Sequence, residues 1–367
     1  METETETEIE ETDENVSDND VEINNPFSTK DIKITNAIIL LPSLIKQLKY
    51  DEIDLLPDFQ RHANLWDVNK MSRLIESILL KLPLPVFYFD VSNSDKWVIV
   101  DGLQRLSTIK RFFVEKSFKL KNLEFLIALN GKNYDDLERP LQRTIDDTQL
   151  VTYQIEAQTP KKVRYSIFNR INTGGLSLNA QEIRQALNQE GDGVRFLREV
   201  ANDDIFKRVV GISNKRMAGQ ELVLRFMAFK ILDEKYFTTM HEFLDSAMEA
   251  IDKKQKNELD ILKGNLLEVL EFSEKILGKN HKFSRSSKRK LVNKSLFDVL
   301  SVCLDEIQDK ETFFKNKDQF LKTLKQKLED ETSSFFESIT TGTSGKKATV
   351  TRFNTIKQLI KEVLNDH

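Results

Sequence analysis

The sequence predicts an α+β protein, in which a small domain that mixes strands with helices, residues 34–190, precedes an all-helical domain, residues 191–367. Two observations predict this class. Short runs of β-branched and aromatic residues, typical of strands, lie before residue 190 and become scarce after it. Apolar residues at helical spacing continue to the end of the chain. A chain of 367 residues is long enough for two or three such units.

The first regular elements of the mixed domain are a helix and a hairpin. Residues 68–82 place apolar side chains at helical spacing, with Asp67 as the N-cap and Pro83 as the stop. VFYFD and KWVIV, residues 86–90 and 96–100, predict two strands joined by the turn-forming SNSD. The second strand runs directly into DGLQRLSTIKRFF, which has helical spacing. We therefore expect Asp101 and Gly102 at a junction between a strand and a helix.

Further elements follow after a less regular stretch. LVTYQIEA predicts a strand before Pro160, and KKVRYSIFNRIN predicts a helix that the Gly174–Gly175 pair ends. Asn179 with Glu182 three positions later indicates a capping box at the start of another helix. Beyond residue 190 we expect helices near 218–234, 238–252, 257–278, 290–308, 311–338 and 348–365. No period of 20 to 50 residues recurs, so a solenoid is not indicated.

The net charge of −4 conceals an asymmetry. Residues 1–22 contain eleven Asp or Glu and no Lys or Arg, so the rest of the chain carries a net charge of +7. A segment this polar and self-repelling cannot bury a core, and we expect residues 1–25 to form a disordered acidic tail. The tail is either a solubilising leader or a shield that mimics DNA over a basic site.

Composition excludes several classes of protein. No run approaches the roughly 18 apolar residues of a membrane span, and METETETEIEE has neither the basic nor the apolar region of a secretory signal. We therefore expect a cytoplasmic protein with no membrane partner. A single cysteine, Cys303, excludes an intramolecular disulfide and a cysteine-cluster metal site. Its apolar surroundings predict a core residue.

The segment VDGLQRLSTI carries the sharpest chemical signal. A glycine after a strand permits a tight turn, and the helix that follows offers unpaired N–H groups and a positive dipole end to an anion. Arg105 adds a bidentate phosphate donor, and Gln104 an adaptable polar group. Asp101 would repel phosphate unless it binds Mg²⁺, orients water or pairs with an arginine such as Arg61. The alternative is structural: Asp101 caps the helix and Arg105 pairs on the surface.

Two further segments place polar residues between apolar anchors, a common layout for a site. LPDFQRHANLW holds Gln60 and Arg61 between Phe59 and Trp66. FNRINTGGLSLNAQEIR places polar residues around its Gly-Gly turn, namely Arg170, Asn172, Glu182 and Arg184. Each segment alone is also compatible with a solvated surface.

Taken in order, PDFQR with a Trp five residues later, LIESILLKLPLPVFYF, VDGLQRLSTI and FNRINTGGLSLNAQEIRQAL resemble the DGQQR-motif family, the N-terminal domain of GmrSD-type modification-dependent restriction enzymes. The resemblance covers roughly residues 35–230. It implies a ParB/sulfiredoxin-like mixed α/β core followed by helices, nucleoside-triphosphate binding and often hydrolysis, and defence against foreign, frequently modified, DNA.

The resemblance also implies roles for individual residues. Asp101, Gly102, Gln104 and Arg105 match the DGQQR element, Gln60 and Arg61 the FQR element, and Arg170 and Asn172 the RIN element. Asp101 and Gln104 are then the catalytic candidates, with Asp101 also the candidate ligand of Mg²⁺. The other six residues are candidates for binding nucleotide and phosphate.

Two departures from the family pattern bear on activity. Leu103 stands where the family motif has its first glutamine; if that glutamine positions water, hydrolysis suffers, and if it faces the core, nothing is lost. Longer relatives carry a C-terminal HNH nuclease domain, whose chemistry needs a metal-binding histidine with further ligands. Here only His281 with Asn293 has loosely suitable spacing. We therefore expect a separate subunit to cut any DNA.

Residues 279–294 contain seven Lys or Arg and no acidic residue. Such a run is either solvated surface or a contact to the phosphate backbone of DNA. The candidates for DNA binding are Lys282, Arg285, Lys288, Arg289 and Lys290, and Phe283 is a candidate for stacking on a base.

Three functions follow from these patterns. The first is a protein that binds and hydrolyses a nucleoside triphosphate with Mg²⁺ and acts in DNA restriction, with DNA and a nuclease subunit as partners. The second is a non-catalytic adaptor that binds DNA or docks a separate nuclease. The third, a purely structural helical scaffold, explains none of the polar motif residues.

Overall fold

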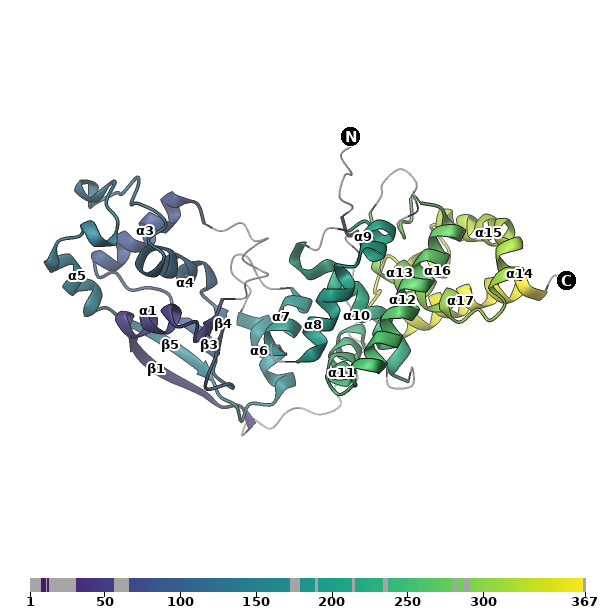
Figure 1. Cartoon of the computed structure of the whole chain (residues 1–367), viewed down its shortest axis with the longest axis horizontal. Helices are drawn as coiled ribbons and strands as arrows, with labels where there is room; N and C mark the ends of the chain where they lie inside the picture. The colour runs from purple at the N-terminus through teal and green to yellow at the C-terminus, as the bar shows by residue number, and fades with distance from the viewer. Residues whose placement is uncertain are drawn as a thin grey trace. The chain divides into compact units, whose positions relative to one another are not determined.

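A computed structural model of the chain describes residues 8–10, 12, 31–55, 66–171, 179–188, 191–212, 215–233, 237–279, 281, 283–286 and 291–365. The chain forms two compact units, Asn25–Leu187 and Asn188–His367, and the second unit includes the N-terminal stretch Met1–Asn24. A mixed sheet with helices makes up the first unit, and helices make up the second (Figure 1). The predicted α+β class is confirmed.

The sheet of the first unit has five strands in the order β1-β5-β3-β4-β2. The β1–β5 and β3–β4 pairs are antiparallel, whereas β5–β3 and β4–β2 are parallel. The predicted hairpin is confirmed, with Phe89 opposite Ile99. The strands are β1 (Ile34–Leu40), β2 (Ile53–Asp54), β3 (Phe87–Asp90), β4 (Trp97–Asp101) and β5 (Gln149–Ile155).

Each face of this sheet is covered by its own apolar cluster. Ile99 on β4 faces one cluster, while its neighbours Val98 and Val100 face the other, because successive side chains of a strand alternate between faces. The larger cluster includes residues of α1 (Leu41–Lys49), α3 (Val68–Leu79), α4 (Leu103–Ile109), the π-helical turn Lys110–Val114 and α5 (Arg139–Asp146). The smaller cluster includes residues of α6 (Lys161–Ile171) and α7 (Ala180–Leu187).

Local capping residues set the helix boundaries much as predicted. The Asp67 carboxylate accepts the backbone N–H groups of Asn69 and Lys70 at 2.8 and 2.9 Å, which starts α3. At α7, Glu182 accepts the backbone N–H of Asn179 at 2.7 Å and Asn179 accepts that of Glu182 at 2.8 Å. This reciprocal pair is the predicted capping box. The Gly174–Gly175 turn lies outside the described residues.

The described helices of the second unit agree with most of the expected segments. Two helices, α8 and α9, lie where none was assigned. The single helix expected over 311–338 is instead three. The last of them is separate because the Asp330 carboxylate accepts from Thr332 and Ser333 then caps a new helix. The helices are α8 (Asp192–Ala201), α9 (Asp204–Val210), α10 (Ala218–Ile231), α11 (Met240–Asp252), α12 (Lys256–Leu277), α13 (Lys294–Asp305), α14 (Lys310–Lys315), α15 (Lys317–Glu329), α16 (Ser334–Ser338) and α17 (Lys346–Asn365), with a 3₁₀ turn at Lys215–Met217.

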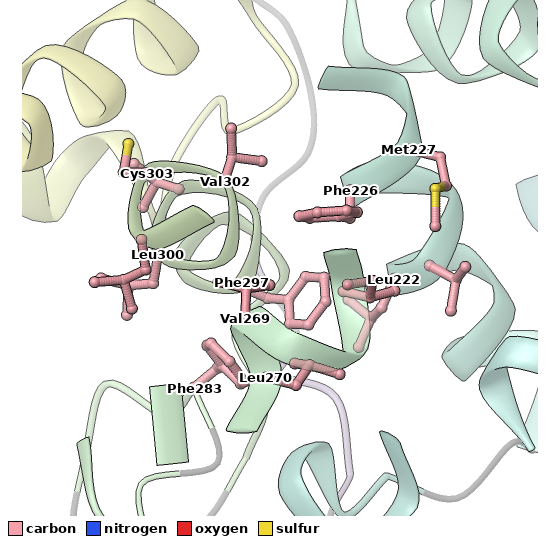
Figure 2. Packing of buried hydrophobic residues seen from close by; sticks show 14 of the residues in the cluster. Leu222, Phe226, Met227, Val269, Leu270, Phe283, Phe297, Leu300, Val302 and Cys303 are labelled. Atoms are coloured by element: carbon pink, nitrogen blue, oxygen red, sulfur yellow. The ribbon is translucent and has the colours of Figure 1, made fainter. Parts of the chain in front are cut away.

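One apolar cluster forms the core of this helical unit. Leu222 and Phe226 of α10, Leu270 of α12 and Phe297 of α13 are fully buried within it (Figure 2). Cys303 is also buried there, as its apolar sequence context predicts. The burial of many large apolar side chains supplies most of the driving force for folding this unit.

The helical unit also holds part of the N-terminal acidic segment. Ile9 forms a parallel β-bridge with Val292, and Ile9 packs against the helical core. Residues 8–10 and 12 are the described part of the expected tail, residues 1–25. Among the helices that the structure describes, none combines the length and apolar character needed to cross a membrane.

Candidate functional site

The junction between β4 and α4 requires glycine at position 102. Gly102 has φ of +102°, a backbone conformation that L residues with a side chain rarely adopt. A Cβ atom there would lie 2.6 Å from Cδ1 of Phe87. The backbone can turn from the strand into the helix because this Cβ is missing. Asp101 thus ends the strand and Leu103 begins the helix, as predicted.

Arg105 holds this junction together from inside. Its guanidinium donates to the backbone carbonyls of Pro85 and of Val86, the latter at 3.1 Å, and to Oδ2 of Asp101 at 3.0 Å. It also lies over the Phe87 ring, 4.5 Å from the centroid. Burial lowers the pKa of Arg105 below its usual value, and the Asp101 carboxylate offsets part of this effect. The assignment of Arg105 to phosphate stays a prediction, because its described partners belong to the protein.

The structural alternative for these two residues differs from what is observed. Asp101 does not cap α4: the N-cap is Gly102, which has no side chain to accept a hydrogen bond. Arg105 does not pair on the surface either, since its side chain is only 10% exposed. The Asp101–Arg105 ion pair is mostly buried and connects the end of the strand to the first turn of the helix.

Asp101 is the more accessible residue of this ion pair. Its side chain is 32% exposed, and Oδ2 is held by Arg105. No residue in the described part of the chain donates to its second carboxylate oxygen, Oδ1. A fixed, partly exposed carboxylate oxygen suits Mg²⁺, which prefers hard oxygen ligands and takes one or two carboxylates plus water and phosphate. No cluster of three His, Cys, Asp or Glu suited to a metal occurs among the described residues.

Gln104 connects the DGLQR turn to Trp66 through a hydrogen bond. The backbone N–H of Trp66 donates to Oε1 of Gln104 at 3.1 Å. Trp66, the last residue of LPDFQRHANLW, is thus held at the DGLQR turn. Gln60 and Arg61 themselves lie outside the described residues.

Leu103, which replaces a glutamine of the family motif, is partly buried and packs against both apolar clusters of the first unit. The side chain at this position therefore contributes to packing.

Of the two candidates in the RIN segment, the structure describes Arg170 but not Asn172. Arg170 lies at the end of α6 and is exposed, while Asn172 lies outside the described residues. Two neighbours have structural roles instead: Glu182 is fully buried in its capping box, and Arg184 is buried with its guanidinium 6.0 Å from the centroid of the Tyr165 ring.

One buried pair near the site was missed from the sequence. Asp90, at the end of β3, accepts from Nη1 of Arg164 at 3.0 Å and from the backbone N–H of Ser92 at 2.8 Å. This pair ties α6, and thus Arg170, to the end of the strand beside β4. The signal was an aspartate at the end of a predicted strand, but nothing in the sequence named its partner 74 positions away.

The basic segment has two described residues of interest. Arg285 forms an ion pair with Glu10. Phe283 is not available to stack on a base, because it is 2% exposed and packs edge-on against Phe297. The other candidates, Lys282, Lys288, Arg289 and Lys290, lie outside the described residues. Asn293, considered above with His281, is fully buried and caps α13.

The fold defines a mixed α/β domain with a polar strand-to-helix junction, followed in the chain by a helical unit. Residues 43–188 match the family model described as the N-terminal domain of GmrSD restriction endonuclease. The match includes the whole DGLQR turn and supports a role related to DNA restriction. No curated protein and no solved structure matches the chain.

Proposed function

We propose that the first unit binds a nucleoside triphosphate with Mg²⁺ at the β4–α4 junction and hydrolyses it, in a protein that acts in the restriction of foreign DNA. The observation that carries this proposal is the Asp101 carboxylate. One of its oxygens is fixed by Arg105, and the other accepts no hydrogen bond from the described residues. A carboxylate held this way is oriented before any ligand arrives, which favours catalysis.

The roles of the neighbouring residues follow from their positions. Gly102 allows the turn that brings the start of α4 to the end of β4, and the N–H groups at the start of α4 are suited to an anion. Asp101 would hold Mg²⁺, which neutralises phosphate charge when bound. Gln104, anchored beside Trp66, would orient the attacking water. Gln60, Arg61, Arg170 and Asn172 are the further candidates for binding phosphate.

Replacement of Asp101 tests this assignment. Asp101→Asn keeps the shape of the side chain but removes the charge, and we expect phosphate release to fall by about 10² to 10⁴. Asp95→Asn is the matched control, because Asp95 is an exposed aspartate in the turn before β4. Both variants should keep the circular dichroism spectrum of the parent. Parent-like turnover by Asp101→Asn would show that this carboxylate is not part of the chemistry.

Nucleotide binding can be measured without turnover. A thermal-shift screen with each of the four nucleoside triphosphates and MgCl₂ should raise the melting temperature of the parent for at least one of them, since a ligand at 100 times its Kd stabilises by about 2.7 kcal/mol. The shift should shrink when EDTA replaces MgCl₂, and it should also shrink in Asp101→Asn.

One observation favours a second candidate function, a non-catalytic adaptor that binds DNA or docks a separate nuclease subunit. The guanidinium of Arg105 is engaged by two carbonyls and a carboxylate of the protein, which leaves it less able to grip phosphate than the family motif implies. An adaptor would release no phosphate with any of the four nucleotides and MgCl₂, with or without DNA. It would still bind DNA or the nuclease.

A further inference from the structure

The acidic segment at residues 8–10 is bound to the helical unit as a short extended strand. The backbone N–H of Glu10 donates to the carbonyl of Val292 at 2.8 Å, and the N–H of Val292 donates to the carbonyl of Glu8 at 2.8 Å. Ile9, between them, packs against the helical core. Backbone pairing fixes the position of the segment, so the side chain of Glu10 is brought to a defined place.

At that place the Glu10 carboxylate is bound through both oxygens. Oε1 accepts from Nε of Arg285 at 2.7 Å and also from Nη2 of the same guanidinium, while Oε2 accepts from Nδ2 of Asn293 at 2.9 Å. The Glu10 side chain is 13% exposed and that of Arg285 is 29% exposed. The carboxylate is therefore held by one full positive charge and one amide, at the edge of solvent.

The donors of this site are also positioned by the helical unit. The Arg285 guanidinium lies over the Phe336 ring, 5.0 Å from its centroid. Asn293 donates to the carbonyl of Ile339 at 2.8 Å, and its Oδ1 accepts the N–H of Leu296 at 2.8 Å. Because these contacts involve neither oxygen of Glu10, an anion site would remain if the carboxylate left.

A phosphodiester matches this pair of donors. Its two non-bridging oxygens carry a negative charge, as the two oxygens of a carboxylate do, and guanidinium groups bind both kinds of anion through paired hydrogen bonds. Residues 279–294 contain seven Lys or Arg and no acidic residue, a composition that attracts a polyanion.

We propose that Arg285 and Asn293 form a site for the phosphate backbone of a nucleic acid, and that Glu10 occupies it within the same chain. The acidic N-terminal segment is then a competitor that nucleic acid displaces. This inference does not rest on nucleotide binding at Asp101, which lies in the other unit, so the loss of one activity leaves the other to be measured.

Charge-matched variants of the full chain test the proposal by fluorescence anisotropy with a labelled 30-base-pair duplex. Glu10→Gln removes the carboxylate that pairs with Arg285, and we expect about three- to tenfold tighter binding at low salt. Glu8→Gln is the control, because it removes the same charge two residues away while Glu8 contributes only its backbone carbonyl to the contacts. Equal affinities of these two variants would overturn the proposal.

The salt dependence gives a second readout. If Arg285 becomes available to one more phosphate in Glu10→Gln, the slope of log K against log salt steepens by about 0.9 relative to the parent. In Glu10→Gln/Arg285→Gln the extra steepness and the gain in affinity should both vanish. Persistence of either in the double variant, or absence of duplex binding by every variant at low salt, would also overturn the proposal.

Competition in trans separates the segment from general charge effects. A chain lacking residues 1–12 should bind the duplex at least as tightly as Glu10→Gln, and a synthetic peptide of residues 5–14 should displace the duplex from it. The same peptide with Glu10→Gln should compete at least about threefold less well. Equal competition by the two peptides would show that Glu10 is not the group that occupies the site.

Discussion

At the scale of single residues, Gly102 shows how close packing can specify one amino acid at the candidate site. Its positive φ and the nearby Phe87 ring are two separate obstacles to a side chain, and both act at the turn that presents Asp101. A residue with a Cβ would strain the backbone and also push against an aromatic ring in the core. The glycine is therefore needed by the fold, whatever ligand binds there.

Replacement of Gly102 should destabilise the first unit, because of the positive φ and the nearby Phe87 ring. Gly102→Ala is expected to lower the free energy of unfolding of the first unit by about 2–3 kcal/mol, from backbone strain plus overpacking. Gly131→Ala is the control, since Gly131 has φ of +83° but no atom within 4 Å of its would-be Cβ. It should cost about 1 kcal/mol. Urea denaturation of both variants measures the difference, and equal losses would mean that the Phe87 ring gives way freely.

The position of the candidate site could be predicted from the sequence, but its internal contacts could not. Asp101 and Gly102 lie at the strand-to-helix junction because a strand pattern runs directly into a helix pattern. The inward contacts of Arg105 escaped prediction because its acceptors are the carbonyls of Pro85 and Val86, 20 and 19 positions away in an irregular stretch. Backbone carbonyls occur at every residue, so no sequence pattern marks the ones that will be used.

At the scale of elements, local signals predicted best. The hairpin of β3 and β4 and the capped starts of α3 and α7 depend on residues within a few positions of one another. The order of strands does not: β5 lies between β1 and β3, and Ala37 of β1 pairs with Thr152 of β5. Such pairing depends on how the apolar faces are buried together in three dimensions. Sequence patterns therefore predicted β3, β4 and β5, but neither β1 and β2 nor the arrangement of the strands.

Helix α3 is joined to the irregular stretch at residues 124–126 by one buried carboxylate. Glu76 accepts the backbone N–H groups of Glu124, Phe125 and Leu126, at 2.7 to 3.1 Å. Burial raises the pKa of Glu76, but these hydrogen bonds and the charge of Arg73 together lower the pKa by more than burial raises it. The pKa of Glu76 therefore lies below its ordinary value of 4.5. The Glu76 carboxylate thus accepts the backbone N–H groups of residues 124–126, which a helix or strand would otherwise pair with carbonyl groups.

Neutralising this carboxylate should destabilise the first unit. Glu76→Gln is expected to cost about 2–3 kcal/mol near pH 7, because an amide cannot satisfy all three donors. A lowered pKa in the folded state means that the stability contributed by the charge is full above about pH 4.5 and is lost as the pH falls through the folded pKa. The gap between parent and variant should therefore narrow in acid.

Urea denaturation as a function of pH measures this gap. Glu124→Gln is the control, because the Glu124 side chain is 62% exposed and pairs only with Arg73 among the residues described. It should cost less than about 1 kcal/mol at any pH. A constant difference between Glu76→Gln and the parent from pH 7 to pH 3 would contradict the proposed role of the charge.

At the scale of the whole molecule, the two units are built around different cores. The first unit buries apolar clusters on both faces of a sheet, and the second buries one large helical cluster that also encloses charged residues. Asp298 is fully buried between Arg225, which donates from Nε at 3.0 Å, and Arg352, whose Nη2 lies 3.8 Å away. Burial raises the pKa of Asp298, while the two guanidinium groups oppose this.

Removal of this buried charge should affect one unit only. Asp298→Ala removes the buried carboxylate that two buried guanidinium groups share, and we expect the helical unit to lose about 3–5 kcal/mol. Calorimetry of the full chain should show the transition of the helical unit at a lower temperature and that of the first unit unchanged. The control is Asp192→Ala, which breaks an exposed ion pair with Arg195. It should change the free energy of unfolding of either unit by less than about 1 kcal/mol. A joint shift of both transitions would show that the units unfold together.

The contact between Glu10 and Asn293 spans 283 positions of the chain. During synthesis from the N-terminus, residue 10 leaves the ribosome long before residue 293 exists. The growing chain therefore displays its acidic residues throughout translation, and the contact can form only when the protein is nearly complete. Closing so long a loop costs only modestly more entropy than closing a short one, because the cost grows with the logarithm of the loop length.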